Sequence, residues 1–266
     1  MRTFIALTLV ILISFSCKNE ENSIESTTEE LEKSNIIFEE NFNEDSLNET
    51  YWNYELGDGC PNLCGWGNNE RQIYSKENAT IKNGYLVIKA TKDAFVYKSA
   101  KLTTKQKVEF KYGSVEVRAK LPLGHGLWPA IWMLGNDIDT KGWPACGEID
   151  IMEYVGKAPN KVHTTLHTPD SFGQSKNTKI TVDENIEKGF HVYKTNWSKD
   201  KIEFFIDSKL VYTFNPEIKN DTTWPYNKPF YIILNLAIGG DFGGPEVDDS
   251  IFPQEFIIDY VKVLKI

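Results

Sequence analysis

Short runs in which apolar and polar residues alternate recur along the chain from residue 36 to its end. Alternation with a period of two is the pattern of a strand that buries one face. Glycine, asparagine and aspartate separate the runs and favour turns. Since none of these segments shows convincing helical periodicity, the pattern predicts one antiparallel β-sandwich or barrel over residues 36–266. The expected strands are YLVIKA, KYGSVEVRAKL, LWPAIWML, GEIDIMEYV, KVHTTLHT, HVYKTNWS, KIEFFID, KLVYTF, FYIILNLAI and FIIDYVKVLKI.

The first residues follow a different pattern. Arg2 precedes an apolar run, Phe4 to Ile13, that is too short to span a bilayer comfortably and is typical of an export signal. The run ends at Cys17, and the segment resembles a bacterial lipoprotein signal, with residues 1–16 removed and Cys17 acylated. An ordinary secretory signal with an incidental cysteine is the alternative. Residues 17–35 are so polar that we expect a disordered tether.

This reading predicts an exported protein that a lipid anchors to a membrane, at the outer membrane or the cell surface. Composition adds a second constraint. The formal net charge is -9, which argues against nucleic acid and polyanionic ligands because a negative field repels both. No phosphate-binding loop or dinucleotide motif occurs. The seven Trp and twelve Tyr exceed the needs of a core, so aromatic side chains are available for binding. We expect a monomer.

The segment GEIDIMEYVG carries three carboxylates, Glu148, Asp150 and Glu153. A regular strand places the first two on one face and the third on the other. A β-bulge at Ile151 or Met152 would return Glu153 to the first face, and bulges are frequent beside active sites. When carboxylates lie so close together, the pKa of at least one of them is raised. The raised pKa provides the proton donor that glycoside hydrolysis requires. The alternative is the solvated face of an ordinary strand.

Tryptophans and histidines surround this segment in the sequence. Trp128 and Trp132 share one face of their strand, and Trp143 lies in the loop before the first carboxylate. Indole rings stack on the C–H faces of pyranoses, which suggests a sugar-binding cleft; core packing is the alternative for the first two. His163 and His167 also share a face. Without a third ligand at a suitable spacing, we expect them to line a cleft and not to bind a metal.

The motif E-I-D-I-M-E, together with GCPNLCGWGNNERQIY, GHGLWPAIWMLG, HTTLHTP and NLAIGGDFGG, is similar to glycoside hydrolase family 16 in its bacterial laminarinase form. The resemblance implies an all-β jelly roll of two stacked antiparallel sheets with a concave substrate cleft. It also implies endo-acting hydrolysis of β-1,3-glucan by a retaining double displacement, without a catalytic cofactor. By this resemblance Glu148 is the nucleophile, Glu153 is the general acid/base, and Asp150 hydrogen-bonds the nucleophile.

The same resemblance implies further site residues. A structural calcium ion would bind backbone carbonyls of Asn41 and Gly84 and the carboxylate of Asp259, since calcium takes oxygen ligands. A solvent-facing Asp259 is the alternative, and Arg118 could be an ordinary edge cation. The residues expected to contact sugar are Asn68, Arg118, Trp128, Trp132, Trp143 and His167.

The remaining cysteines predict one disulfide. Cys60 and Cys64 flank a Pro-Asn-Leu turn, and in an exported chain they can close a small loop. Cys146 is then a buried free thiol. Two other functions stay open: a non-catalytic β-glucan-binding protein, or the same fold acting on mixed-linkage glucan or an algal galactan. The three acids favour an enzyme, and the negative charge disfavours sulfated galactans.

Overall fold

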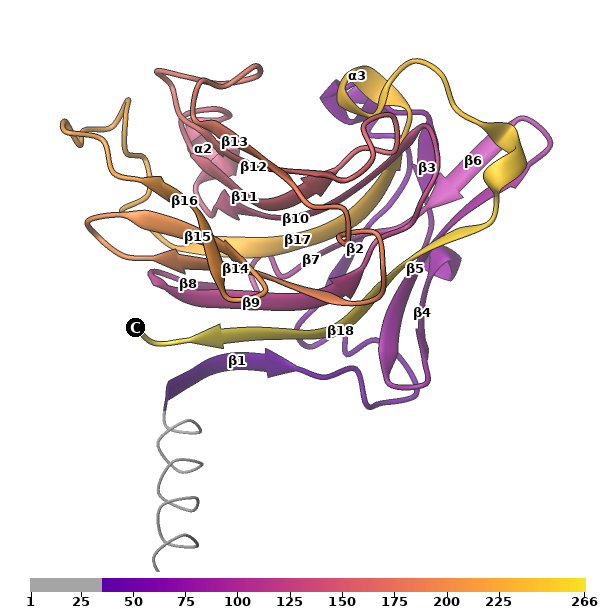
Figure 1. Ribbon diagram of the computed structural model, residues 1–266, viewed down its shortest axis with the longest axis horizontal. Coiled ribbons are helices and arrows are strands. Elements are labelled where there is room, and N and C mark those ends of the chain that lie inside the picture. The colour runs from indigo at the N-terminus through magenta and orange to yellow at the C-terminus, as the bar shows by residue number, and fades with distance from the viewer. Residues whose placement is uncertain (1–34) are drawn as a thin grey trace, which may run out of the picture. The chain divides into compact units, whose positions relative to one another are not determined.

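The computed structural model describes residues 35–266, and in this region two β-sheets pack face to face (Figure 1). The predicted sandwich of antiparallel sheets is therefore confirmed. The predicted signal segment 1–16, the lipid site at Cys17 and the tether up to residue 34 lie outside the described residues, so they remain predictions. Within residues 35–266, every helix is too short or too polar to cross a membrane.

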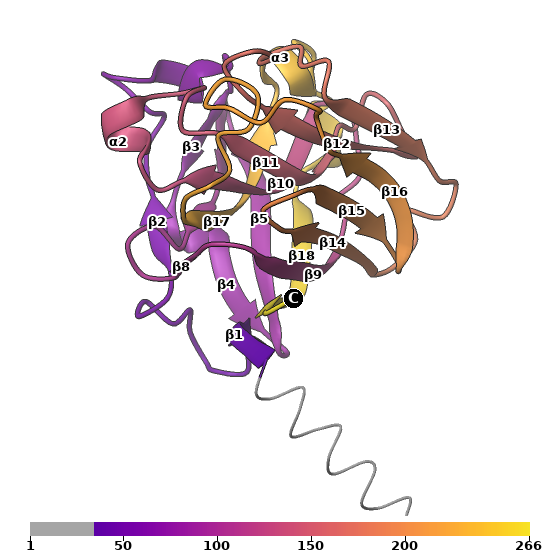
Figure 2. The same ribbon diagram turned by 90° about the vertical axis from the view of Figure 1, so that its left-hand side faces the viewer.

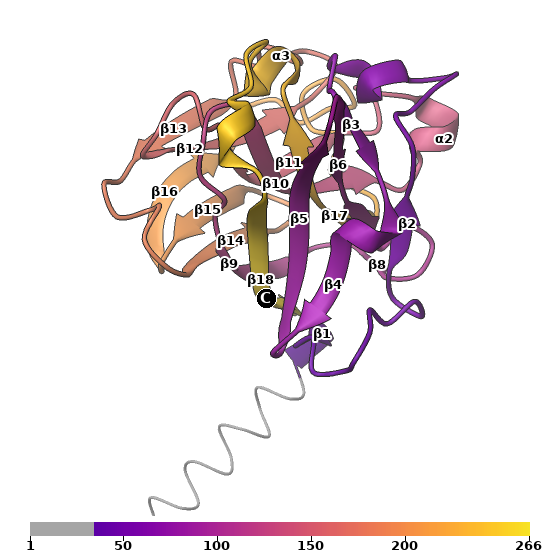
Figure 3. The ribbon, with the colours of Figure 1, turned by 90° about the vertical axis from the view of Figure 1, so that its right-hand side faces the viewer.

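One layer, called the outer sheet here, is built around the pairing of β9 with β18 (Figure 3). Its neighbouring strands are antiparallel except β3 and β6, which pair in parallel. Strand β1 (Ile36–Glu40) pairs with β18, and β4 (Ala79–Lys82) pairs with β5. The order of the others is β16 (Lys209–Phe214), β15 (Ile202–Ile206), β14 (His191–Trp197), β9 (Gly113–Lys120), β18 (Gln254–Leu264), β5 (Tyr85–Asp93), β6 (Val96–Ser99) and β3 (Gln72–Tyr74).

The second layer, called the concave sheet, curves so that its outward face is concave (Figure 1). Short helices α2 (Ile138–Lys141) and α3 (Gly240–Gly243) lie beyond opposite ends of its strands (Figure 2). Strand β8 (Glu109–Phe110) pairs with β17. The order of the other strands is β13 (Thr178–Val182), β12 (Lys161–His167), β11 (Glu148–Tyr154), β10 (Leu127–Gly135), β17 (Phe230–Ile238), β7 (Lys101–Thr103) and β2 (Asn53–Glu55). Three short 3₁₀ turns complete the chain: η1 (Cys64–Gly67), η2 (Lys76–Asn78) and η3 (Asp249–Ile251).

Alternation along the strands places the core between the two sheets. On β9, Val115, Val117 and Ala119 are fully buried, while Glu116 and Arg118 point outward. Strand β17 is buried along its whole length. A strand that is covered on both faces reads as a nearly continuous apolar run, as FYIILNLAI does. Burial of β17 fixes the middle of the concave sheet, and β10 and β11 follow it in order.

Candidate active site

A β-bulge interrupts β11 at the predicted position. Trp132 of β10 lies opposite Asp150, but the preceding residue, Ile131, lies opposite Met152. Ile151 is therefore the extra residue, without a partner on β10. The pairing of β11 with β12 shifts in the same interval. An extra residue in one strand changes the face to which later side chains point.

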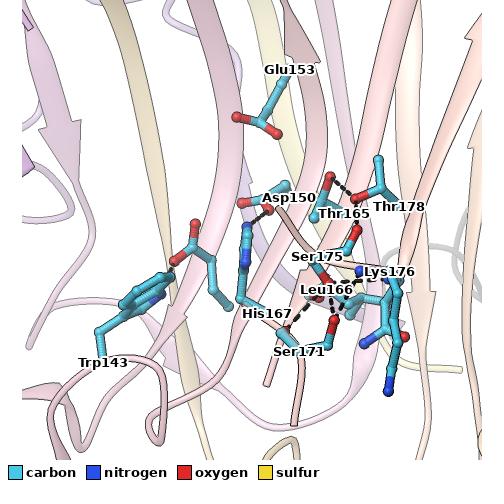
Figure 4. A network of polar contacts seen from close by, with 12 residues as sticks. Trp143, Asp150, Glu153, Thr165, Leu166, His167, Ser171, Ser175, Lys176 and Thr178 are labelled. Carbon is cyan, nitrogen blue, oxygen red and sulfur yellow. Dashed lines mark hydrogen bonds and ion pairs between the residues drawn. The ribbon is translucent and has the colours of Figure 1, made fainter. Parts of the chain in front are cut away.

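The bulge brings the three carboxylates to the concave face. Ile149, Met152 and Tyr154 are buried in the core. Glu148 and Asp150 lie beside His167, and Figure 4 shows Asp150 and Glu153 close together on β11. Asp150 is only 2% exposed, and Glu148 and Glu153 are partly buried. The sequence prediction of one shared acidic face is therefore confirmed.

A different neighbour contacts each carboxylate. Trp143 Nε1 donates a hydrogen bond to Glu148 Oε2 over 2.6 Å. His167 Nε2 lies 3.2 Å from Asp150 Oδ2, and Trp128 Nε1 donates to Glu153 Oε1 over 3.1 Å. Rotation of each acid is thus restricted separately. Pre-set orientation of this kind is what a catalytic constellation needs.

Burial dominates the electrostatics of these acids. It raises the pKa of Glu148 to about 8, and the charge of Asp150 acts in the same direction, while His167 and the indole of Trp143 oppose the shift. Burial, followed by the charge of Glu148, raises the pKa of Glu153 to about 7. Burial also raises the pKa of Asp150. The cluster therefore retains a proton near neutral pH, as the sequence predicted. These shifts do not separate a nucleophile from an acid.

The two histidines line the same face, as predicted. His163 lies opposite Glu153 on β12, and the ring of Phe242 approaches it edge-on with centroids 5.0 Å apart. Burial lowers the pKa of His163, so this ring is neutral near pH 7. His167, Glu148 and Asp150 each offer a ligand atom within 4.8 Å of the others. The three close ligand atoms thus come from one histidine and two carboxylates, and His163, the other histidine of the predicted pair, is not among them.

Aromatic side chains border the carboxylates at both strand ends. Trp143 is 45% exposed and forms an edge-to-face contact with Phe172, which is 51% exposed, with centroids 5.4 Å apart. Sequence reasoning missed Phe172 because its loop has no strand pattern. Hydrogen bonds hold this loop: Ser175 Oγ donates to the Leu166 carbonyl over 2.8 Å (Figure 4). At the other end Phe242 packs edge-on against Trp128, at 5.3 Å.

Asn68 lies next to helix α3, which follows β17. Its carbonyl accepts a hydrogen bond from the Asp241 amide over 2.7 Å, which joins the loop after η1 to helix α3. Its side-chain amide donates to Glu70 Oε1 over 3.2 Å. Trp132 donates its indole N–H to Asn235 of β17 over 2.8 Å. The structure thus places Trp132 beside β17 and Asn68 beside the helix that follows this strand.

The prediction that Arg118 contacts sugar is wrong. Arg118 lies on β9 of the outer sheet and points away from the core, on the side opposite the concave face. Its guanidinium pairs with Asp259 and lies 4.5 Å from the ring centroid of Phe190. A sandwich has two outward faces, and the alternation of β9 alone does not say which of them Arg118 occupies. The alternative of an ordinary cation describes it better, but not one at an edge, because β9 lies between β14 and β18.

The fold brings together the three segments that hold the predicted calcium ligands: β1, which ends next to Asn41, pairs with β18, and Ile258, next to Asp259, lies opposite Leu86, two residues after Gly84. The segment that holds Asn41 approaches Gly84, because a Cβ added there would lie 3.7 Å from Asn43 Oδ1. Asp259, however, binds the guanidinium of Arg118. An ion pair competes with a metal for the same carboxylate oxygens. The contacts of Asp259 therefore favour the ion pair, and the calcium site stays a prediction.

The structure contains the expected disulfide. Cys60 and Cys64 are bonded, with Cα atoms 4.1 Å apart, and they close the loop that leads into η1 and Asn68. Cys146 is free and buried. Burial raises the pKa of its thiol to about 12, so Cys146 stays protonated and poorly nucleophilic at neutral pH.

Comparison with known proteins gives one consistent match. Residues 67–260 fit the family model described as glycosyl hydrolases family 16. A solved laminarinase from Flavobacterium sp. UMI-01 is 59% identical with a TM-score of 0.85, over 86% of this chain and 100% of that one. An endo-beta-1,3-glucanase from Pyrococcus furiosus is 40% identical with a TM-score of 0.82, over 86% and 94% respectively. A beta-glucanase from Rhodothermus marinus is 40% identical, over 80% of this chain and 79% of its own length.

Proposed function

The chain belongs to glycosyl hydrolases family 16, and from this membership we propose that it cleaves β-1,3-glucan at internal linkages with retention of anomeric configuration. The observation that carries the proposal is the bulged strand β11, which presents three carboxylates with raised pKa values on one concave face. Tryptophans that can stack on pyranose rings border that face. Laminarin-type polysaccharide is the substrate class that the similar proteins support.

In the proposed first step, ionised Glu148 attacks the anomeric carbon and forms an ester to the sugar. The bond from this carbon to the glycosidic oxygen breaks, and protonated Glu153 gives its proton to the departing oxygen. In the second step Glu153, now ionised, removes a proton from water. The water oxygen attacks the same carbon, and the ester bond to Glu148 breaks. Both residues return to their initial protonation states, so no cofactor is required.

The neighbours of the carboxylates support these roles. The N–H of Trp143 points at Glu148 and stabilises its ionised form before attack. Asp150 lies between Glu148 and Glu153 in the strand, and its contact with His167 holds it in place. Three carboxyl groups this close together disfavour a second negative charge in the cluster, so one glutamic acid can remain protonated while the other is ionised.

The alternative function is glucan binding without hydrolysis. Such a protein has no need for three neighbouring acids on one face, and burial of a charged carboxylate is unfavourable unless the group is paired and hydrogen-bonded. The test is an activity screen on laminarin, lichenan, agarose and carrageenan, with NMR of the first products. We expect reducing ends from laminarin and an initial β-anomer. An initial α-anomer would exclude retention, and turnover of a galactan alone would replace the substrate class.

A further inference from the structure

A chain of hydrogen bonds leads away from Trp132, and all its members run in one direction. The indole N–H of Trp132 donates to Asn235 Oδ1 over 2.8 Å, and Asn235 Nδ2 donates to the Tyr74 hydroxyl over 3.1 Å. That hydroxyl donates in turn to Glu70 Oε2 over 3.1 Å. The chain crosses from β10 through β17 to β3 and ends on a carboxylate. None of the three acids of β11 takes part in it.

Glu70 collects further donors. Gln72 Nε2 donates to its Oε2 over 2.6 Å, and Asn68 Nδ2 donates to its Oε1 over 3.2 Å. The other end of the Gln72 amide accepts from the Ile238 N–H over 2.8 Å, which ties β3 to the end of β17. An ionised carboxylate accepts only, so it satisfies all three side-chain donors at once. An amide in its place would put an NH₂ group against one of them.

Burial makes this chain of hydrogen bonds sensitive to substitution of its members. Tyr74, Gln72 and Asn235 are all buried, so a broken link leaves a buried polar group unpaired. Lys101 supports the ring of Trp132 from another direction. Its Nζ lies 5.3 Å from the Trp132 ring centroid and 4.3 Å from that of Trp66.

We infer that Glu70 is a positioning residue for substrate binding, which fixes the orientation of Trp132 and Asn68 through hydrogen bonds. The inference rests on the proposed function and extends it to the buried residues that hold Trp132 and Asn68 in place. The three carboxylates of β11 keep their own partners when Glu70 changes. Loss of Glu70 should therefore weaken glucan binding more than it slows the chemical steps.

The test begins with Glu70→Gln, which keeps the shape of the side chain. We expect KM for laminarin to rise about tenfold and kcat to stay within about twofold of wild type. The matched control is Glu77→Gln, in the exposed turn η2, which should behave as wild type. Equal KM values for both variants would overturn the inference, and so would a large fall in kcat for Glu70→Gln without a rise in KM.

A double-mutant cycle separates positioning from general damage. Trp132→Phe keeps a ring but removes the N–H that begins the chain, so combining it with Glu70→Gln should cost less than the product of the two single effects. Independent, multiplicative effects would contradict a shared chain. If Glu70→Gln melts below the assay temperature, Tyr74→Phe interrupts the chain at one hydroxyl and decides the question in the same assay.

Calorimetric binding of laminarin oligosaccharides distinguishes this inference from the proposed function. If wild type binds them without hydrolysis, the proposed function fails, and the dissociation constant of Glu70→Gln still tests positioning. A tenfold weaker constant supports the inference and an unchanged one rejects it. If wild type neither hydrolyses nor binds them, both the function and the inference fail.

Discussion

The two glutamates of β11 contact different tryptophans, Glu148 through Trp143 and Glu153 through Trp128. Since neither contact passes through the other acid, each glutamate can be replaced without removing the anchor of its partner. Separate substitution is therefore a fair test of separate roles.

We predict that Glu148→Ala and Glu153→Ala each lower turnover by about 10²-fold or more while the fold is retained. Azide should rescue both on an activated substrate, with opposite products. The Glu148 variant should give the α-azide, because azide replaces the nucleophile. The Glu153 variant should give the β-azide, because azide attacks the glycosyl-enzyme. NMR of the products identifies them; the reverse pattern would exchange the roles, and near-normal turnover would remove a residue from the mechanism.

The raised pKa of Glu148 predicts a pH-dependent cost to stability. Its pKa is about 8 in the folded protein against an ordinary 4.5, so the stability associated with the neutral acid is present below pH 4.5 and is lost as pH rises through 8. Glu148→Gln cannot ionise. Its melting temperature should exceed that of wild type by several degrees at pH 8 and by little at pH 4, because 1 kcal/mol corresponds to about 2–4 °C at this size.

Thermal melts from pH 4 to pH 9 measure this difference. Glu217→Gln is the matched control, since Glu217 lies exposed after β16, and its melting curve should follow wild type at each pH. If the difference in melting temperature between Glu148→Gln and wild type does not widen as the pH rises, the pKa of Glu148 is not raised in the folded protein.

At the scale of elements, the long strands could be predicted and the short ones could not. Strands such as β9, β15 and β18 carry enough alternating residues to reveal their period. Strand β7 has three residues and β8 has two, so neither shows a period. They are strands because β17 lies beside them. Information about that neighbour is not local, and tertiary pairing supplies it.

The same limit explains which site residues were found. The carboxylates of β11 and the bulge between them lie within one segment, so period and spacing were sufficient. Glu70 and Asn235 are far apart in sequence, and only the fold brings them into one hydrogen-bond chain. Arg118 failed for a related reason, because alternation identifies an outward face without saying to which sheet it belongs.

The Cys60–Cys64 bond gives an element-scale prediction. It closes a short loop before η1, so its loss should cost about 2 kcal/mol or less. The variant Cys60→Ser/Cys64→Ser should melt about 4–8 °C below wild type at most. Adding reductant should lower the wild-type melting temperature to that of the variant. The melting temperature of the variant, which retains Cys146, should not change, so this measurement controls for an effect of reductant on Cys146. Peptide mapping without reductant that finds both thiols free would reject the bond.

For the whole molecule, we propose that a lipid on Cys17 attaches the domain to a membrane. The apolar run that ends at this cysteine, followed by a polar segment, motivates the proposal. Cys17→Ala should move the protein from the membrane fraction to the soluble fraction without changing turnover on laminarin. Intact mass shows the lipid directly. Cleavage at another position without acyl chains would leave an ordinary secreted enzyme.

The strand order also has a consequence for folding during synthesis. Strand β10 pairs with β17, and β9 pairs with β18, so the two strands that come latest in this domain complete both sheets. On an emerging polypeptide the three acids are present before the strands that complete both sheets. Until residues 230–264 arrive, β10 and β9 each lack one of the strands with which they pair in the folded domain. The growing chain therefore carries the complete catalytic motif while it is still unable to hydrolyse a glucan.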